Sequence, residues 1–519
     1  MIRVYNTLSK TKEPFETLAP GKVGIYLCGP TVYKPSHIGH MVGPTIFDAI
    51  KRFLVYSGYQ VKLVINITDV DDKLIAESQK RGISMQAVAE EMTADYKRNL
   101  AAMQIDTVDE FPKATDYIPA IIKFTQGLIS QGFAYASDGD VYFDVTKFAQ
   151  YGKLSNRRSD DMQGEGGSTA ERKRSSGDFA LWKKAKAGEP SWESPWGAGR
   201  PGWHIECSVM SRELLGETFD IHGGGLDLIF PHHENEVAQS ECRHGKPPAK
   251  YWLHNGLMQA SAEVGKLGGR NTREAEAAPQ AGDQAAQEAG KMGKSKGASA
   301  FRDLLQKYAG ETIRFFLLST HYRRPIDYSE ARIDEVQTGL QQFYRFFQRF
   351  DRITGQAFYQ LPFEQRRKDA PATSDELLKA CLANREKFLE FMDDDFNTGG
   401  AVAELFEVVR ALNRFVESEK LEDPAQRDPQ KLASLVAGAK ILRELAAIIN
   451  LFQQPIAASA AAASDDGLAG KLMELIIELR AEARKTKNFA TADKIRNALT
   501  AAGVVLEDRP DGTGWSVKK

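Results

Sequence analysis

The chain has 519 residues, which is enough for three or four domains. Its hydrophobic content of 42% and charged content of 27% are ordinary for a globular protein, and the net charge of −2 excludes a nucleic-acid surface that covers the whole molecule. The first residues, MIRVYNTLSK, lack the apolar core of a signal peptide, and no apolar run reaches the length of a membrane span. Four cysteines are too few for a disulfide framework, so we expect a cytoplasmic protein with reduced thiols.

The first predicted strand covers residues 23–27 and ends at Cys28. A turn-rich segment then leads through the motif HIGH at residues 37–40 into an apolar run with helical spacing. The motif therefore comes just before a helix N-terminus, where backbone N–H groups and the helix dipole favour anionic oxygens. Gly39 would let a flat ring or a phosphate approach, and His37 and His40 can face the same bound group. Taken alone, the motif is explained equally well by two surface histidines.

Cys28, the following GPTVY and the motif HIGH together resemble the nucleotide-binding signature of the class I aminoacyl-tRNA synthetases. A cysteine just before that signature looks like the cysteinyl branch of the family. The resemblance implies site residues in this segment, namely Gly29 for cysteine, Pro30, Gly39 and His40 for ATP, and His37 and His40 for catalysis.

A second strand is predicted at residues 61–67 and a helix from about residue 72. This alternation over residues 1–130 predicts a doubly wound parallel sheet, which would be the first half of a Rossmann-type catalytic domain. The second strand ends in Asn66-Ile67-Thr68-Asp69, and open α/β sheets bind ligands at the carboxyl ends of their strands. Alternatively, Thr68 and Asp69 merely cap the next helix. The resemblance implies that Thr68 lines the amino-acid pocket.

Residues 131–200 interrupt the alternation of strands and helices. Residues 152–186 are rich in Ser, Gly, Arg and Asp, and charge runs of this kind are usually solvated loops. The segment resembles the insertion that splits the catalytic sheet in class I synthetases. The second half of the catalytic domain is then expected over residues 201–300.

Two helices in this second half carry candidate metal ligands. Cys207 lies early in one predicted helix, and Pro231 fits the first position of the other. On that second helix His232 and Glu236 are one turn apart on one face, as a shared metal requires. Such a pair is common by itself, but Cys28 and Cys207 supply two soft ligands. The resemblance places all four side chains together as the ligands of one zinc ion.

A third strand is predicted to end in HGGG at residues 222–225, followed by Asp227. Glycines there would let the backbone approach a ribose. The carboxylate of Asp227 could then accept hydrogen bonds from the ribose hydroxyls. The alternative is a simple glycine-rich turn. The resemblance implies that Gly224 and Asp227 bind ATP and that Trp203 and His222 contact cysteine.

Residues 261–290 contain almost no large apolar side chain, so we expect a mobile surface insert. The string KMGKS at residues 291–295 follows directly and resembles the second family signature, KMSKS. Two lysines on a glycine-bearing loop suit a clamp on triphosphate oxygens. The resemblance implies that Lys291 and Lys294 bind ATP and that Lys294 acts in catalysis. Gly293 replaces a serine of the usual motif, and KGA at residues 296–298 stands where the family usually has Leu-Gly-Asn.

The remaining chain predicts three further parts. Residues 301–335 are expected to form a stem-contact region, and residues 336–455 a helical bundle with apolar stripes at helical period. The string MDDDFNT at residues 392–398 resembles a helix start in the anticodon-binding bundle of this class. Residues 456–470 are alanine-rich and predict a linker.

The last segment, residues 471–519, has a net charge of +3 from 10 Lys and Arg against 7 Asp and Glu. It predicts two helices and two short strands, and it resembles the C-terminal anticodon-recognition module of the cysteinyl enzymes. An exposed Trp515 would suit stacking on single-stranded bases, although a core position explains it equally well.

The resemblance covers the chain outside residues 261–290. It implies a monomeric cysteine–tRNA ligase that uses ATP with Mg²⁺, L-cysteine and tRNA(Cys), carries one zinc ion and needs no membrane. One alternative is a related ligase that joins cysteine to an amino sugar and has no use for residues 471–519. Another is a zinc hydrolase, although two thiolates make zinc a poorer Lewis acid and HIGH would be unexplained.

Overall fold

The computed structural model describes residues 1–157, 172–260, 300–455, 468–509 and 512–517. Its centre is a parallel sheet in the order β10-β9-β3-β4. The four strands are β3 (Lys22–Leu27), β4 (Gln60–Ile65), β9 (Phe219–Gly225) and β10 (Ala249–Asn255). The predicted doubly wound sheet is therefore confirmed. The chain runs outward from β3 to β4 and, in the opposite direction, from β9 to β10, so the strand order reverses between β3 and β9. Ligands bind at the carboxyl ends beside such a reversal.

Two helices pack on opposite faces of β3. Leu27 contacts the helix α1 (Gly39–Tyr56) near Gly43, whereas Gly24 faces Leu215 at the end of α5 (Trp203–Leu215). Side chains of a strand alternate between its two faces, so these contacts place α1 and α5 on different sides of the sheet. The helix α1 begins at Gly39, inside the HIGH motif and earlier than the apolar spacing predicts.

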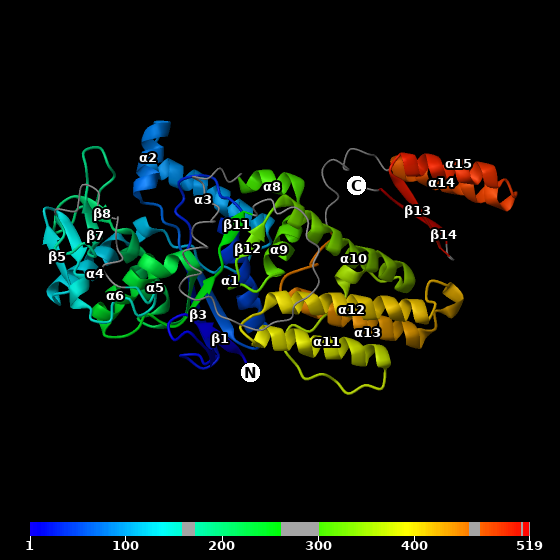
Figure 1. Cartoon of the computed structure of the whole chain (residues 1–519), viewed down its shortest axis with the longest axis horizontal. Coiled ribbons are helices and arrows are strands. Elements are labelled where there is room, and N and C mark those ends of the chain that lie inside the picture. The colour runs from blue at the N-terminus through cyan, green and yellow to red at the C-terminus, as the bar shows by residue number, and fades with distance from the viewer. Residues whose placement is uncertain (158–171, 261–299, 456–467, 510–511, 518–519) are drawn as a thin grey trace.

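The catalytic half contains further helices and two small sheets beside the central one (Figure 1). They are β1 (Arg3–Asn6), β2 (Thr11–Pro14), α2 (Asp72–Arg81), α3 (Met85–Ala102), α4 (Ile118–Ser130), α6 (Glu234–His244), β11 (Met258–Ala260), α8 (Phe301–Lys307), α9 (Gly310–Leu318) and β12 (Ile326–Tyr328).

The insertion contains a second, antiparallel sheet. Its strands, in the order β5-β6-β7-β8, are β5 (Ala134–Ser137), β6 (Asp140–Phe143), β7 (Phe179–Lys184) and β8 (Gly199–Pro201). The expectation that residues 152–186 are solvated loops is wrong for β7, whose Leu181 and Trp182 are fully buried. Nearby basic residues contact side chains of this sheet. Arg172 pairs with Asp140 at 2.9 Å, and the Arg174 guanidinium lies 4.0 Å from the centre of the Tyr135 ring. Residues 158–171 lie outside the described residues.

A bundle of four long helices follows the catalytic half and lies beside it (Figure 1). The helices are α10 (Glu330–Thr354), α11 (Glu376–Asp393), α12 (Thr398–Ser418) and α13 (Pro429–Ile448). The apolar stripe of α12 is buried at Leu405 and Val409, as its spacing predicts. The start of α12 falls within MDDDFNT, where the Asn397 side chain accepts from the Gly400 N–H.

The C-terminal module consists of α14 (Leu468–Lys485), α15 (Phe489–Ala501) and the hairpin of β13 (Val504–Arg509) and β14 (Gly512–Val517). Two charge-assisted contacts fasten the hairpin to α14, since Arg480 donates to both carboxylate oxygens of Asp508 at 2.6 and 2.7 Å. Trp515 is 38% exposed, so it is not a core residue. Figure 1 shows the module set apart at the far end of the molecule.

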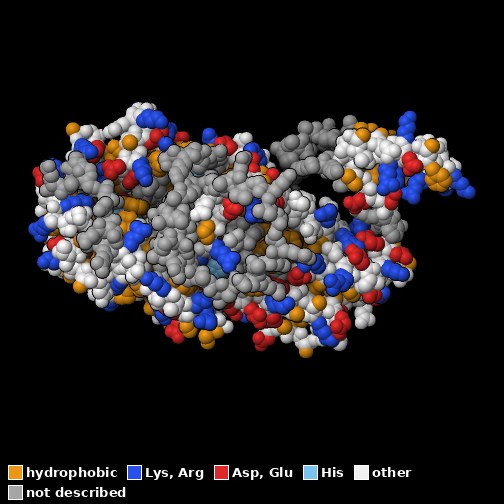
Figure 2. Space-filling view, viewed as in Figure 1, with side chains coloured by type: hydrophobic (Ala, Val, Ile, Leu, Met, Phe, Trp, Pro, Cys, Tyr) orange, Lys and Arg blue, Asp and Glu red, His pale blue; other side chains and the backbone are white. Residues whose placement is uncertain are grey.

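Positive and negative side chains are interspersed over the face drawn in Figure 2, as the net charge of −2 leads us to expect. Within the residues that the structure describes, no helix combines the length and the apolar character that crossing a membrane requires. The four cysteines are all free thiols.

Candidate active site and metal centre

The site lies where β3 and β9 end side by side. Tyr26 pairs with His222 across these strands, and the Cys28 N–H donates to the Gly223 carbonyl at 3.0 Å. A cavity of about 540 Å³ opens at this edge. It occupies the position where an open α/β sheet binds its ligand.

Most of the predicted site residues line this one cavity. They are Cys28, Gly29, Pro30, His37, Gly39, His40, Thr68, Trp203, Cys207, Gly224, Asp227 and His232. His222 and Glu236 are not among the described residues that line it, because both are buried behind the wall. Lys291 and Lys294 lie outside the described residues, as does the whole segment 261–290.

The HIGH motif forms a turn at the cavity, at the start of α1, which begins at Gly39 of the motif. The rings of His37 and His40 lie side by side, with 3.9 Å between their centres. The His37 N–H donates to His40 Nδ1 and the Gly39 N–H donates to His37 Nδ1, each at 3.1 Å. Both imidazoles are thus held at the N-terminus of an 18-residue helix, whose dipole favours a bound anion.

A second wall comes from the loop after β4. The Gly29 N–H donates to the Asn66 side chain at 2.7 Å, and the Thr68 hydroxyl donates to Glu206 at 3.0 Å. Burial raises the pKa of Glu206 well above its usual range. The alternative that Thr68 and Asp69 cap the next helix is wrong. Asp71 caps α2 by accepting from the Lys73 N–H, and Asp69 accepts from Thr115 instead.

The structure brings the four predicted metal ligands together. Their ligand atoms all lie within 4.8 Å of one another. Cys28 Sγ is 3.6 Å from Cys207 Sγ, from His232 Nε2 and from Glu236 Oε1, and the last two atoms are 3.1 Å apart. Tetrahedral zinc with bonds of about 2.0–2.3 Å separates its ligands by roughly 3.3–3.8 Å. The donor set and its spacing therefore fit a zinc ion.

Neighbouring side chains orient His232 and shift the pKa values of the two cysteines. The Trp203 ring stacks on His232 with 4.2 Å between centres, and His232 Nδ1 lies 2.9 Å from His204 Nδ1, which leaves Nε2 for a metal. Burial would raise the pKa of Cys207, but hydrogen bonding with Cys28 and His232 outweighs it and lowers the pKa to about 6. Burial and the contact with Cys207 raise the pKa of Cys28 well above its usual range.

The local backbone around His232 differs from the prediction. The helix α6 begins at Glu234 rather than at Pro231, because residues 229–233 form a wider turn before it. His233 nevertheless has helical dihedral angles, so His232 and Glu236 still face each other one turn apart.

Three buried histidines near the metal group were missed from the sequence. His204 contacts His232, His233 Nε2 lies 3.3 Å from Cys28 Sγ, and His254 Nε2 lies 2.7 Å from His233 Nδ1. Burial, together with neighbouring histidines, lowers the pKa of His233 well below its usual range. The sequence offers no signal for these contacts, because the residues in contact come from different strands and helices.

The glycine run has a packing role as well as a predicted binding role. A side chain at Gly223 would meet the Phe47 ring of α1, at 2.1 Å from an added Cβ. One at Gly224 would meet His233 at 2.6 Å. These glycines let α1 and His233 approach the sheet closely. Asp227 lines the cavity, where its contact with a ribose stays a prediction.

Comparison with protein families accounts for most of the chain. Residues 14–267 and 283–338 match the class I tRNA synthetase (C) catalytic domain. Residues 387–453 match the DALR domain, and residues 474–515 match the cysteinyl-tRNA ligase anticodon binding domain. The chain belongs to the cysteine–tRNA ligase family. An anticodon binding domain is not expected of a cysteine–amino sugar ligase or of a zinc hydrolase, so neither alternative is favoured.

Individual relatives agree with this family. The chain is 43% identical to the cysteine–tRNA ligase of Geobacter metallireducens and 42% identical to that of Geobacter sulfurreducens, with both chains covered in full. Among solved structures, it is similar to Mycobacterium tuberculosis methionyl-tRNA synthetase in complex with methionyl-adenylate. That match has a TM-score of 0.56 and 14% identity and covers 82% of this chain and 90% of the other. At this identity it shows the class I fold alone.

Proposed function

We propose that this chain is a cysteine–tRNA ligase that uses ATP, with Mg²⁺, to activate L-cysteine and then charges tRNA(Cys). The observation that carries the proposal is one cavity lined both by the HIGH turn of α1 and by Cys28, Cys207 and His232. A nucleotide at the first group and an amino acid at the second would meet in that cavity.

The chemistry needs positioning more than a side-chain nucleophile. A carboxylate oxygen of cysteine attacks the α-phosphorus of ATP, the bond from that phosphorus to the bridging oxygen breaks, and pyrophosphate leaves. The 2′-hydroxyl of the terminal adenosine then attacks the acyl carbon, and AMP leaves. His37 and His40 stand at the N-terminus of α1, where they stabilise charge on the phosphate oxygens. Lys291 and Lys294 would do the same from the KMGKS loop.

Other residues of the same lining would bind the amino acid. Gly29, Thr68 and Trp203 line the cavity and would orient cysteine. Cys28, Cys207, His232 and Glu236 would hold a zinc ion, which when bound supplies a Lewis acid that accepts a thiolate far more readily than a neutral hydroxyl. His222 holds Glu236 from behind at 2.9 Å, so its proposed role is support of the carboxylate rather than direct contact with cysteine.

The same proposal places a monomer in the cytoplasm, where thiols stay reduced. Four free cysteines agree with such a compartment.

Amino-acid-dependent exchange of pyrophosphate into ATP tests the proposal, with serine as the matched control for cysteine. We expect exchange with cysteine, negligible exchange with serine, and transfer of cysteine to tRNA when a tRNA pool is added. Exchange without transfer to tRNA would instead support a ligase with another acceptor. Absence of cysteine-dependent exchange would contradict any cysteine-activating ligase.

A further inference from the structure

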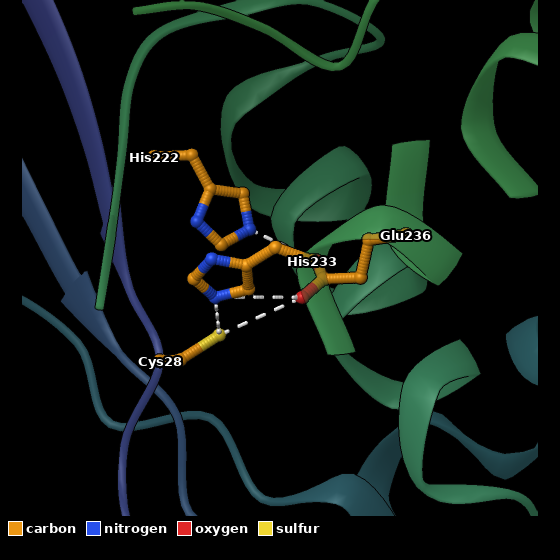
Figure 3. A group of neighbouring side chains, drawn as sticks. All are labelled: Cys28, His222, His233 and Glu236. Atoms are coloured by element: carbon orange, nitrogen blue, oxygen red, sulfur yellow. Dashed lines mark hydrogen bonds and ion pairs between the residues drawn. The ribbon is translucent and has the colours of Figure 1, made fainter. Parts of the chain in front are cut away.

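Cys28 and Glu236 belong to two groups of potential metal ligands, not one. In the second group they are joined by His222 and His233, and the four ligand atoms again lie within 4.8 Å of one another (Figure 3). Cys28 Sγ is 3.3 Å from His233 Nε2 and 3.6 Å from Glu236 Oε1. His233 Nε2 lies 3.9 Å from the same oxygen. These separations are close to those between ligands of a tetrahedral ion.

His233 is oriented as a metal-binding imidazole normally is. Its Nδ1 lies 2.7 Å from His254 Nε2, and His254 Nδ1 lies 2.8 Å from the Thr7 hydroxyl. Both contacts are satisfied when each Nδ1 carries its proton, which leaves the Nε2 lone pair of His233 facing Cys28 and Glu236. A partner on the second ring nitrogen that fixes the tautomer is a regular feature of metal-ligating histidines.

His222 is the fourth member of the group and contacts the other oxygen of the same carboxylate. Its Nε2 is 2.9 Å from Glu236 Oε2, whereas His232 Nε2 contacts the other oxygen, Oε1, at 3.1 Å. The ring is fully buried and stacks on Trp252 with 4.3 Å between centres. Among the described residues its Nδ1 has no hydrogen-bond partner. Glu236 therefore stands between two pairs of ligands and can serve either.

We propose that Cys28, His222, His233 and Glu236 form a second metal-ion position, which overlaps the first and holds one ion in alternation with it. Both positions need Cys28 and Glu236, so one ion occupies either of them at a time. The first adds a thiolate and an imidazole, and the second adds two imidazoles. Thiolate-rich sites favour soft ions, and imidazole-rich sites suit borderline ions such as Ni²⁺. Cd²⁺ therefore takes the first position and Ni²⁺ the second.

X-ray absorption of the unchanged protein, loaded with one equivalent of Cd²⁺ or of Ni²⁺ after metal removal, tests this assignment without any substitution. Two sulfur ligands are expected around Cd²⁺, and one sulfur with at least two imidazoles around Ni²⁺. The same two-sulfur shell around both ions would overturn the second position.

Paired substitutions test the ligands themselves by titration with Ni²⁺. Cys207→Ala with His232→Ala removes the first position, and His222→Gln with His233→Gln removes the second. Circular dichroism shows which variants are folded. The first pair should still bind one Ni²⁺ per chain, at least 100-fold more tightly than the variant with all four changes. Equal binding by these two variants would overturn the proposal, and if either is unfolded the absorption result on the unchanged protein decides.

Discussion

The hydroxyl of Thr68 is held by a carboxylate from behind the cavity wall. Thr68 lines the cavity, and its Oγ1 lies 3.0 Å from an oxygen of Glu206, which is 1% exposed. A buried contact of this kind fixes the direction in which the hydroxyl can meet a substrate, and loss of one partner leaves the other unsatisfied. We infer that Glu206 positions Thr68 for cysteine.

Glu206→Ala should therefore raise the KM for cysteine by about 10-fold or more, on the scale of a lost buried hydrogen bond. The KM for ATP should change little, because Glu206 acts on Thr68, which belongs to the proposed cysteine pocket. Glu206→Gln keeps a side-chain oxygen for the hydroxyl and should recover most of the loss. Glu213→Ala, at an exposed position of the same helix, is the control. Equal effects on both substrates in pyrophosphate exchange would contradict the assignment.

Selection of cysteine over serine should be visible at a zinc ion held by the proposed ligands. The two amino acids differ by one atom, and a pocket that separates substrates by size alone gains roughly 1–3 kcal/mol from a methylene-scale difference. Glu236 is the ligand most able to leave the ion. Its second oxygen lies 2.9 Å from His222 Nε2, so the carboxylate keeps a polar partner after it has left. X-ray absorption of the zinc-loaded protein should show one added sulfur ligand with cysteine and none with serine. An unchanged sulfur count would mean that the ion is structural.

The residues that were predictable from the sequence are those joined by local spacing or by a family signature. His232 and Glu236 are one turn apart, and the signature added Cys28 and Cys207 to them. Glu206 and His254 were missed because their partners lie far along the chain, such as Thr68, which is 138 positions before Glu206. No local periodicity reports a contact between segments that are far apart in the sequence.

At the scale of elements, α1 connects the HIGH motif to the rest of the molecule. Its buried Asp48 accepts hydrogen bonds from Arg314 of α9, from Arg52 and from Thr107. Arg314 is fully buried and also donates to the Ile449 carbonyl at the end of α13, at 3.0 Å. Arg314 thus joins α1 and α9 by an ion pair and reaches the bundle by a hydrogen bond.

Arg314→Met should lower the free energy of unfolding by about 3–5 kcal/mol, because it leaves the charge of Asp48 buried without its main partner. Adding Asp48→Asn should recover part of that loss, since it removes the unpaired charge. Arg410→Met, which breaks an exposed pair with Glu407, is the control and should cost at most about 1 kcal/mol. Urea unfolding measures all four proteins. A loss for Arg314→Met no larger than the control would show that the pair contributes nothing.

The same pair predicts a dependence of stability on pH. Burial opposes ionisation of Asp48, but Arg314 and Arg52 outweigh it and hold the pKa of Asp48 below its usual range. An unfolded aspartate titrates near about 3.9. The contribution of Asp48 is therefore fully present above that pH and is lost as the pH falls through the lower folded pKa. The stability difference between the unchanged protein and Asp48→Asn should be constant from pH 5 to 8 and shrink below about pH 4. A difference that grows on acidification would contradict this.

Elements with a clear period were predicted well, and those without one were not. The strand predicted at residues 23–27 agrees with β3 to within one residue. The agreement is close because the segment is short and apolar and ends at a turn-rich stretch. In contrast, β7 lies in a segment whose Ser, Gly and Arg content predicts loops, although Phe179 and Leu181 anchor it in a core. The start of α6 was misplaced because Pro231 fits a helix start by type, while the wider turn before Glu234 has no sequence signature.

For the molecule as a whole, the bundle and the C-terminal module are attached to the catalytic half in different ways. The last residue of α1, Tyr56, donates to Glu444 of α13 at 2.5 Å, and Arg385 of α11 donates to both of them in a buried network. The bundle is therefore joined to α1 by a network of buried polar contacts. The C-terminal module, by contrast, stands apart from the bundle (Figure 1) and has its own contacts between Arg480 and Asp508.

This difference predicts how the activities divide when the chain is shortened to residues 1–455. The cavity, the ion pair of Asp48 and the Tyr56 network all remain, so cysteine-dependent pyrophosphate exchange should stay within about twofold of the full chain, because distant sites act independently. Charging of tRNA should fall by at least about 10-fold in kcat/KM, the scale of one lost stacked base. Trp515→Ala in the full chain separates stacking from mere loss of the module, since Trp515 is exposed and its removal leaves the fold in place. It should lower charging in the same direction while exchange is unchanged. If the shortened chain lost exchange as well, the module would have to support the catalytic half, and the independence argued from its separate contacts would be wrong.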